Sequence, residues 1–321
     1  MGRADTWTPS YLLLPAGELQ RRAGTALAAL RHCRLCPRRC GVDRSADELG
    51  HCGVGRHAIV ADVGPHHGEE RCLSGVFRDG LATTLGLVGG SGTVFFAGCN
   101  LGCTFCQNWA ISHERRGRPL DADSLARMML LVQRQSCLNL NLVTPSHVVP
   151  QILEALVPAA EAGLHLPIVY NTSGYDEVET LRLLDGVVDI YMPDFKYWSG
   201  QSSAAYLCAE DYPEKARAAI AEMHRQVGDL QLGADGVARR GLLVRHLVMP
   251  EALDESTAIF EWLAQLSPDT FVNVMAQYRP QGAARRDPAL APAGGRRLSR
   301  DEHRLALEAA HRAGLRRAGR W

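Results

Sequence analysis

Short apolar runs alternate with longer amphipathic stretches from residue 93 onward. The runs are rich in Val, Leu, Ile and Phe, as buried strands are, and the stretches between them repeat apolar positions at helical spacing. Strands that alternate with helices indicate parallel βα units, so we predict an α/β fold with a partial (β/α)6 TIM-like barrel. Polar residues and glycines follow the runs, at the strand ends where such barrels place their sites. The predicted strands are residues 93–98, 140–144, 167–174, 187–195, 242–250 and 271–278.

The regions on either side of these units have different patterns. Residues 19–32 form an amphipathic helical stretch. Residues 31–90 are rich in Cys, Gly, His and Arg with weak periodicity, which favours a loop-rich region held together by a metal centre. The tail from residue 281 is first rich in Arg, Pro and Gly and then helical. We therefore expect an N-terminal helical and Cys-rich metal-binding domain, a barrel and a C-terminal tail with a helix, at residues 1–90, 91–280 and 281–321.

Composition and charge exclude several classes of partner. Lys plus Arg and Asp plus Glu number 35 each, so the chain has no strong global field for nucleic acid or an anionic membrane. No apolar run approaches the roughly 20 residues of a spanning helix, and the start of the chain does not resemble a signal peptide. We expect a cytoplasmic protein without nucleic-acid or membrane partners, whose ten cysteines are reduced and need a purpose other than disulfides.

Three of the cysteines lie on one short loop. Cys99, Cys103 and Cys106 directly follow the first predicted strand. Three thiolates can hold three irons of a four-iron cluster and leave the fourth iron open to a ligand. Gly98 and Gly102 allow the backbone to wrap closely around such a group. A zinc loop or three buried thiols are the alternatives.

The loop sequence GCNLGCTFCQN resembles the C-x3-C-x2-C motif of the radical S-adenosylmethionine (SAM) superfamily, with Phe105 as the usual aromatic residue before the third cysteine. The resemblance extends to a branch related to pyruvate formate-lyase-activating enzymes. The segments that carry it are LCPRRCGVDR, HHGEE, NLVTPSH, YNTSGY, MPDFKYW, LVRHLVMP and VNVMAQY. The resemblance implies an oxidoreductase that binds SAM at a 4Fe-4S cluster. An electron from a flavodoxin- or ferredoxin-type reductant would cleave SAM to a 5′-deoxyadenosyl radical, which removes a hydrogen from the substrate.

The second and third strands end in residues that the resemblance places at the cofactor. Thr144, Ser146 and His147 occupy, by position only, the place of a Gly-Gly-Glu contact to the methionyl amine. A helix N-cap is the equal alternative for Thr144 or Ser146. Asn171 and Thr172 match the place of an Asp-Thr pair in the activases, where the aspartate helps to form a cation site.

The fourth and fifth strands contribute charged residues. Asp194 and Lys196 match the Asp-x-Lys motif of the activases, which makes them the catalytic candidates in contact with SAM. Lys196 is one of two lysines beside 33 arginines, and a surface ion pair is the alternative role. Successive side chains of a strand point to opposite faces, so one of Arg245 and His246 is expected to point into the barrel and the other toward its helices. An inward Arg245 suits a carboxylate of the cofactor or substrate, or a partner aspartate of the barrel.

The second cysteine group provides four thiolates and therefore a closed site. Either an auxiliary 4Fe-4S cluster or a tetrahedral zinc fits four thiolates. Three neighbouring arginines would offset the negative charge of the thiolates. The cysteines are Cys33, Cys36, Cys40 and Cys52, and the arginines are Arg34, Arg38 and Arg39.

Two further expectations concern substrate access and substrate type. Residues 66–72, HHGEERC, are rich in ligand-type side chains, and we expect a lid near the barrel mouth rather than a solvated turn. The substrate is open between a glycyl residue of a partner protein and a small molecule or peptide in a biosynthetic pathway. The competing class is a non-enzymatic iron–sulfur electron carrier or a zinc-stabilised binding module, neither of which requires six βα units.

Overall fold

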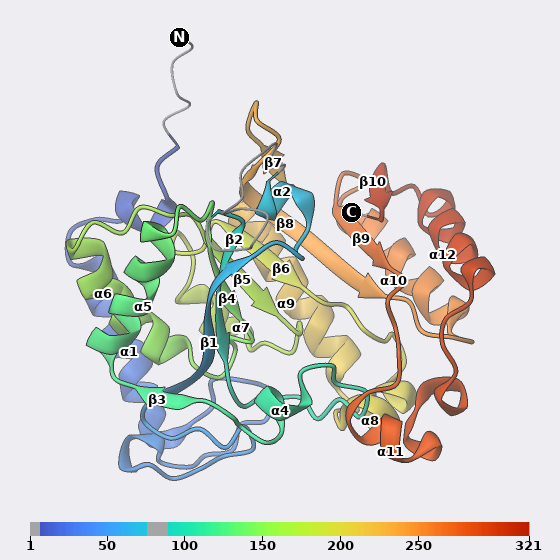
Figure 1. Cartoon of the computed structure of the whole chain (residues 1–321), viewed down its shortest axis with the longest axis horizontal. Helices are drawn as coiled ribbons and strands as arrows, with labels where there is room; N and C mark the ends of the chain where they lie inside the picture. The colour runs from blue at the N-terminus through green and yellow to red at the C-terminus, as the bar shows by residue number, and fades with distance from the viewer. Residues whose placement is uncertain (1–6, 76–88, 321) are drawn as a thin grey trace.

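The computed structural model describes residues 7–75 and 89–320. Within them, the central element is a ten-stranded sheet with strand order β10-β9-β8-β6-β5-β4-β2-β1-β3, and β7 pairs with β8 beside this path (Figure 1). Across these same ranges, every helix is too short or too polar to cross a bilayer. The strands are β1 (Ala58–His66), β2 (Ser91–Phe96), β3 (Arg118–Leu120), β4 (Leu140–Val143), β5 (Ile168–Thr172), β6 (Ile190–Pro193), β7 (Gln231–Leu232), β8 (Ala238–Leu247), β9 (Phe271–Met275) and β10 (Arg317–Gly319).

Seven strands of the sheet are parallel, and β10 is the last of them. The other six follow one another in chain order. They are β2, β4, β5, β6, β8 and β9, and each carries one of the six apolar runs, so the predicted βα alternation is confirmed. All residues of β4, β5 and β6 are buried, because helices cover one face and side chains from opposite strands fill the other. The sheet ends at β3 and β10 and is therefore open, as a partial barrel is.

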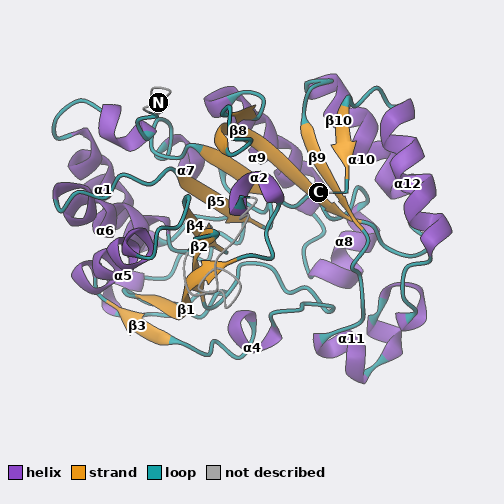
Figure 2. Ribbon diagram, turned by 45° about the horizontal axis from the view of Figure 1, so that its top comes forward, coloured by secondary structure: helices purple, strands orange, loops and turns teal. Residues whose placement is uncertain are grey.

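Helices cover the outer face of the sheet in three groups, and the middle group is α7 with α9, which packs on β6 and β8. α1 packs against α6 and α6 against α5 at one end, and α10 packs against α12 at the other (Figure 2). The helices are α1 (Glu18–Ala28), α2 (Arg71–Ser74), α4 (Trp109–Ser112), α5 (Ala122–Arg134), α6 (Val149–Glu161), α7 (Val178–Arg182), α8 (Gly200–Leu207), α9 (Tyr212–Val227), α10 (Leu253–Leu266), α11 (Gly282–Arg286) and α12 (Arg300–Arg312). Short 3-10 helices are η1 (Ser10–Leu13), η2 (Ala29–His32), η3 (Arg44–Ala46), η4 (Pro288–Leu290) and η5 (Pro292–Gly295).

The N-terminal region contributes a strand to the same sheet, which differs from the expected domain boundary at residue 90. β1 pairs antiparallel with β2, and β3 pairs with β1. The sequence pattern missed β1 because Gly64 and Pro65 interrupt it, its register shifts between Val60 and Asp62, and many of its side chains are half-exposed. At the other end of the chain, β10 joins the sheet beside β9 and α12 packs on α10, so the C-terminal segment is also part of this sheet layer.

The segment expected to form a lid at the barrel mouth lies at the opposite end, so that prediction is wrong. β1 runs antiparallel to β2, which brings His66 beside Ser91 at the amino end of β2. The chain then enters the interior from this end: a carboxylate oxygen of Glu70 accepts a hydrogen bond from Asn273 at 2.7 Å. α2 follows and packs Leu73 into the buried apolar cluster between the strands.

A buried carboxyl joins the amino terminus to the sheet. Asp189, immediately before β6, accepts hydrogen bonds from the N–H and the hydroxyl of Ser10 at 2.8 and 2.7 Å. Its second oxygen accepts the N–H of Ile168 at 2.8 Å, at the start of β5. Burial raises the pKa of Asp189 to about 6, against the hydrogen bonds and the charge of Arg240, which lower it.

We expect Asp189→Asn to remove a pH dependence of stability. The raised pKa means that the native state binds a proton more tightly than the unfolded chain, in which Asp titrates near ~3.9. The contribution of this carboxyl to the free energy of unfolding therefore falls as pH rises from about 4 to about 6. Urea unfolding at pH 4 and pH 7 should show the wild-type minus variant difference falling by about 2–3 kcal/mol. The same difference at both pH values would contradict this account, and the exposed Asp235→Asn control should change by less than about 0.5 kcal/mol.

Candidate functional site

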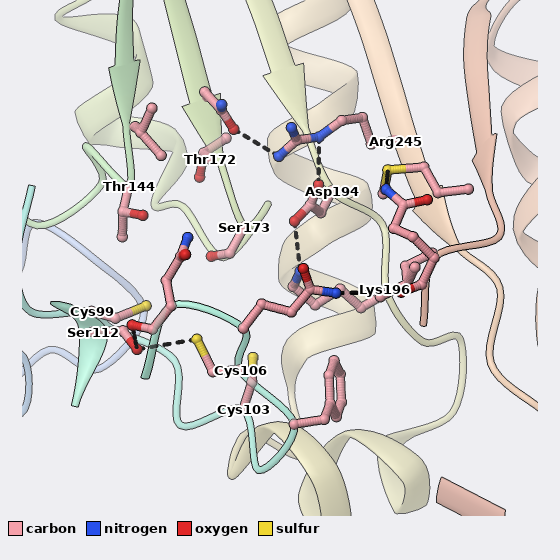
Figure 3. Close-up of a pocket in the computed structure, with 18 residues that line it drawn as sticks. Cys99, Cys103, Cys106, Ser112, Thr144, Thr172, Ser173, Asp194, Lys196 and Arg245 are labelled. Atoms are coloured by element: carbon pink, nitrogen blue, oxygen red, sulfur yellow. Dashed lines mark hydrogen bonds and ion pairs between the residues drawn. The ribbon is translucent and has the colours of Figure 1, made fainter. Parts of the chain in front are cut away.

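A cavity of about 280 Å³ opens at the carboxyl ends of the parallel strands. Figure 3 shows the three thiols of the cysteine loop on one side, across from the charged side chains at the ends of β6 and β8. The strand register produces this convergence, because parallel strands end at the same edge of a sheet. The lining residues are Cys99, Cys103, Phe105, Cys106, Gln107, Asn108, Ser112, Val143, Thr144, Asn171, Thr172, Ser173, Asp194, Lys196, Arg245, Leu247, Met275 and Gln277.

The cysteine loop between β2 and α4 is held by backbone hydrogen bonds to distant segments. The N–H groups of Gly102 and Thr104 donate to carbonyls of Leu207 and Tyr206, at 3.0 and 2.9 Å. The loop begins at Gly98, whose φ of +81° is left-handed, and a Cβ there would lie 2.6 Å from the carbonyl oxygen of Cys52. Glycine is therefore required for the close approach of these two segments.

The electrostatics of the three thiols suit ligands that a metal must deprotonate. Burial raises the pKa of Cys99 to about 12 and raises the pKa of Cys103 further. The Lys196 ammonium opposes this rise for both thiols. The third thiol, Cys106, lies 3.1 Å from the hydroxyl of Ser112. Buried thiols of this kind become thiolates when a metal cation replaces the proton.

Asp194 joins two cations inside the cavity. One carboxylate oxygen accepts the Lys196 ammonium at 2.6 Å, and the other accepts Nε of Arg245 at 2.8 Å. Burial alone would raise the pKa of Asp194, but the charges of Arg245 and Lys196 and their hydrogen bonds outweigh it and lower the pKa. The side chains of Lys196 and Asp194 are only 13% and 16% exposed. Of the two roles left open for Lys196, this position is inconsistent with a surface ion pair.

Arg245 is directed inward and is bound mainly by the protein itself. Beyond Asp194, its Nη2 donates to the side-chain oxygen of Asn171 at 2.7 Å, and Nη1 lies 3.7 Å from Glu69. The neighbouring His246 lies outside the cavity, bonded to Ser256 of α10 at 2.9 Å, so the predicted alternation is confirmed. The pairing with a barrel aspartate, one of the two alternatives for Arg245, is the one observed.

Thr144 and Thr172 line the cavity, whereas Ser146 and His147 do not. Thr144 has a left-handed φ of +61°, and its N–H donates to the carbonyl of Asn171 at 2.9 Å. The hydroxyl of Ser146 lies 2.9 Å from that of Thr172, which donates to Asp176 at 2.6 Å. Ser146 thus ties two strand-end loops together, and the structure shows no N-cap hydrogen bond from it to α6.

The imidazole of His147 is fully buried behind the cavity. Its Nε2 donates to the carbonyl of Ala97 at 3.0 Å, and Nδ1 has no hydrogen-bond partner among the described residues. Burial lowers the pKa of His147 to about 3, helped by the Arg44 guanidinium, so the ring is neutral. His147 therefore supports the start of the cysteine loop instead of lining the cavity.

Phe105 is buried between two aromatic rings. Its ring meets those of Tyr197 and Tyr278 edge-on, with centroids 6.4 and 5.9 Å apart. The predicted aromatic position thus anchors the loop and also faces the cavity. The cavity is also lined by three residues that the sequence pattern did not predict, Gln107, Asn108 and Ser112. Their sequence signal is their position shortly after Cys106.

The four-cysteine group lies next to this loop. Cys33, Cys36 and Cys52 are buried and Cys40 is exposed. Burial raises the pKa of Cys36 to about 12, and the three other thiols add to the rise, which places all four near one another. The N–H of His51 donates to the sulfur of Cys40 at 3.3 Å, and such N–H contacts favour thiolate ligands. Among the described residues, no group of three or more His, Cys, Asp or Glu side chains is arranged to hold a metal ion.

Comparison with known proteins gives one close relative. No family model matches the chain. The chain is 30% identical over 293 residues to uncharacterized protein MJ0674 of Methanocaldococcus jannaschii, which covers 89% of this chain and 76% of that protein. The chain belongs to the family of MJ0674. Membership in the MJ0674 family establishes common ancestry and not an activity, because that relative is itself uncharacterized.

Two solved structures show weaker similarity than the MJ0674 relative. TYW1 with a lysine–pyruvate adduct bound gives a TM-score of 0.42 at 8% identity, over 68% of this chain and 73% of that chain. OxsB, a cobalamin-dependent S-adenosylmethionine radical enzyme with aqua-cobalamin bound, gives 0.36 at 13% identity, over 55% and 26%. TM-scores this low do not establish a shared fold, so the site itself must support any function.

If the cavity binds SAM, as the sequence resemblance implies, Lys196→Arg should weaken that binding about tenfold or more, although the charge is kept. The guanidinium is planar and larger, so it cannot occupy the ammonium position beside Asp194, where Arg245 already lies at 2.8 Å. A tenfold loss corresponds to about one charged hydrogen bond. Equilibrium dialysis of the iron-loaded protein measures this affinity, with Lys215→Arg on α9 as the matched control. Equal affinity of both variants would return Lys196 to a structural role.

Proposed function

We propose that this protein is a radical SAM enzyme whose 4Fe-4S cluster is held by Cys99, Cys103 and Cys106. One observation supports the proposal above all: these three thiols open into a single cavity together with polar ends of neighbouring parallel strands. A zinc loop or three unrelated buried thiols would not require a cavity of about 280 Å³ with an ion-paired aspartate, lysine and arginine opposite them. The donor set fits the cluster, because three thiolates leave one iron open for SAM.

The chain's own residues would bind and orient the cofactor. When bound, the cluster supplies the electron that breaks the C5′–S bond of SAM. Lys196 has two N–H donors beyond its bond to Asp194, and they would donate to a carboxylate or ribose oxygen of bound SAM. Asp194, held ionised between two cations, accepts hydrogen bonds from amine or hydroxyl groups. Apolar side chains of Val143, Leu247 and Met275 line the same cavity and exclude water from the reacting atoms.

Two substrate classes are compatible with this site. A glycyl residue of a partner protein and a small molecule or peptide both need access from solvent, and the rim residues Gln107, Asn108 and Gln277 are exposed. The experiment that separates the classes is anaerobic turnover of unlabelled SAM with deuterium-labelled substrates, followed by mass analysis of the 5′-deoxyadenosine that forms. Deuterium that comes from a labelled partner protein supports the activase-like class, and deuterium that comes from a labelled small metabolite supports the biosynthetic class.

Replacing any one of Cys99, Cys103 and Cys106 by alanine should reduce reductive cleavage of SAM at least about 100-fold. Each variant removes a ligand from a site with only three, and loss of supporting contacts alone costs about 10–100-fold. Release of 5′-deoxyadenosine after anaerobic reconstitution measures the effect.

Cys208→Ala is the matched control for these variants. The Cys208 sulfur lies 3.4 Å from the carbonyl of Gly102 on the same loop but does not line the cavity. We expect near wild-type cleavage from it. Wild-type cleavage by a Cys103→Ala variant would disprove the cluster assignment.

We also propose that the four-cysteine group holds a second metal centre. Iron and zinc counting identifies it: about eight irons per chain, falling toward four in a Cys33→Ala/Cys36→Ala variant, indicates a second 4Fe-4S cluster. About four irons plus one zinc indicates a structural zinc site. A double variant that keeps all metal and its full thermal stability would contradict a metal centre at this group.

A further inference from the structure

Arg44 is a buried cation beside the four-cysteine group. It begins η3 and is 1% exposed. Nη1 donates to the carbonyl of His147 at 2.7 Å and lies 3.8 Å from the sulfur of Cys33. Nε and Nη2 both donate to the carbonyl of Gly55, at 3.3 and 3.2 Å. Its contacts are therefore two carbonyls and a sulfur, and no Asp or Glu of the described residues pairs with it.

A buried guanidinium without a counter-charge is costly. Neutral thiols do not supply that charge. Four thiolates around a divalent zinc, or around a 4Fe-4S cluster of charge about +2, leave a net charge of about −2. Such a centre would supply the anion that Arg44 lacks. Arg44 thus fits a metal–thiolate centre better than four free thiols.

We propose that Arg44 couples occupancy of the four-cysteine site to the shape of the SAM pocket. The carbonyl that it holds belongs to His147, three residues after Thr144, which lines the cavity. The ring of His147 in turn donates to Ala97, two residues before Cys99. One cation therefore contacts the four-cysteine group and the turn after β4 directly, and reaches the start of the three-cysteine loop through one histidine.

Two other contacts join the four-cysteine segment to the three-cysteine loop independently of Arg44. The Cys52 carbonyl lies so close to Gly98 that any side chain there would collide with it. Arg38, two residues after Cys36, donates from Nε to the carbonyl of Asn100 at 2.8 Å and from Nη1 to that of Cys208 at 2.7 Å. Movement of the four-cysteine segment after metal loss would therefore shift the three-cysteine loop as well.

The first test measures metal retention and does not depend on the proposed function. In a Cys99→Ala/Cys103→Ala/Cys106→Ala background, the four-cysteine group is the remaining cluster of cysteines in the sequence. Arg44→Met should release its metal to a chelator about tenfold faster or more than the parent does. Arg34→Met is the matched control: it removes an arginine charge beside Cys33, but at an exposed position where water and salt screen that charge, and Arg34 makes no hydrogen bond or ion pair within the described residues. Equal release rates from the Arg44 and Arg34 variants would overturn the charge-balancing role.

The second test measures coupling and rests on the proposed function. With the three-cysteine loop intact and iron-loaded, Cys33→Ala/Cys36→Ala and Arg44→Met should each bind SAM about tenfold more weakly, and Arg34→Met should bind it normally. Arg44→Lys is the second variant, which keeps the test decisive if Arg44→Met does not fold. It keeps the charge and should keep the metal, but one ammonium cannot hold both carbonyls, so its SAM affinity should still fall.

The outcomes separate the two proposals. Normal SAM affinity in the Cys33→Ala/Cys36→Ala variant overturns the coupling and leaves the radical SAM assignment intact. Absence of SAM binding by the wild-type protein overturns the radical SAM assignment, and the chelator experiment still decides the role of Arg44. Normal SAM affinity of Arg44→Lys would limit Arg44 to balancing charge and would also contradict the coupling.

Discussion

The parallel register of six strands is the constraint on which the site depends. It places the end of every strand at one edge, so that residues far apart in the sequence, such as Thr144, Asp194 and Arg245, line one cavity. β4, β5 and β6 are buried on both faces, and the polar side chains that follow them face the cavity at that edge. The cysteine loop follows β2 at the same edge and is fixed there by backbone bonds to Tyr206 and Leu207. A shift of one residue in any strand would remove its side chain from the cavity.

Much of this arrangement could be predicted from the sequence. The apolar runs identified six of the seven parallel strands, because fully buried strands carry little polar interruption. The spacing of Cys99, Cys103 and Cys106 identified the loop, and the scarcity of lysine drew attention to Lys196. Alternation within β8 predicted that one of Arg245 and His246 points inward, and the structure shows that it is Arg245. These predictions rest on local pattern, which a sequence carries directly.

Other features depend on tertiary contacts that no local pattern records. β1 was missed because it is interrupted by Gly64 and Pro65 and stabilised by pairing with β2. His147 matched a cofactor position, yet the structure uses its ring to hold Ala97. The importance of Arg44 follows from its burial and from the absence of a carboxylate partner among the described residues, neither of which its sequence position reveals. The roles of His147 and Arg44 therefore follow from their contacts in the folded protein and not from the residues beside them in the sequence.

The most direct test is single-turnover analysis of wild-type protein, reconstituted anaerobically with iron and sulfide and reduced in the presence of SAM. If the three-cysteine loop carries a cluster that opens to this cavity, methionine and 5′-deoxyadenosine should appear in equal amounts, and both should depend on the reductant. A protein that binds about four irons on this loop, yet leaves SAM intact after reduction, would contradict the account.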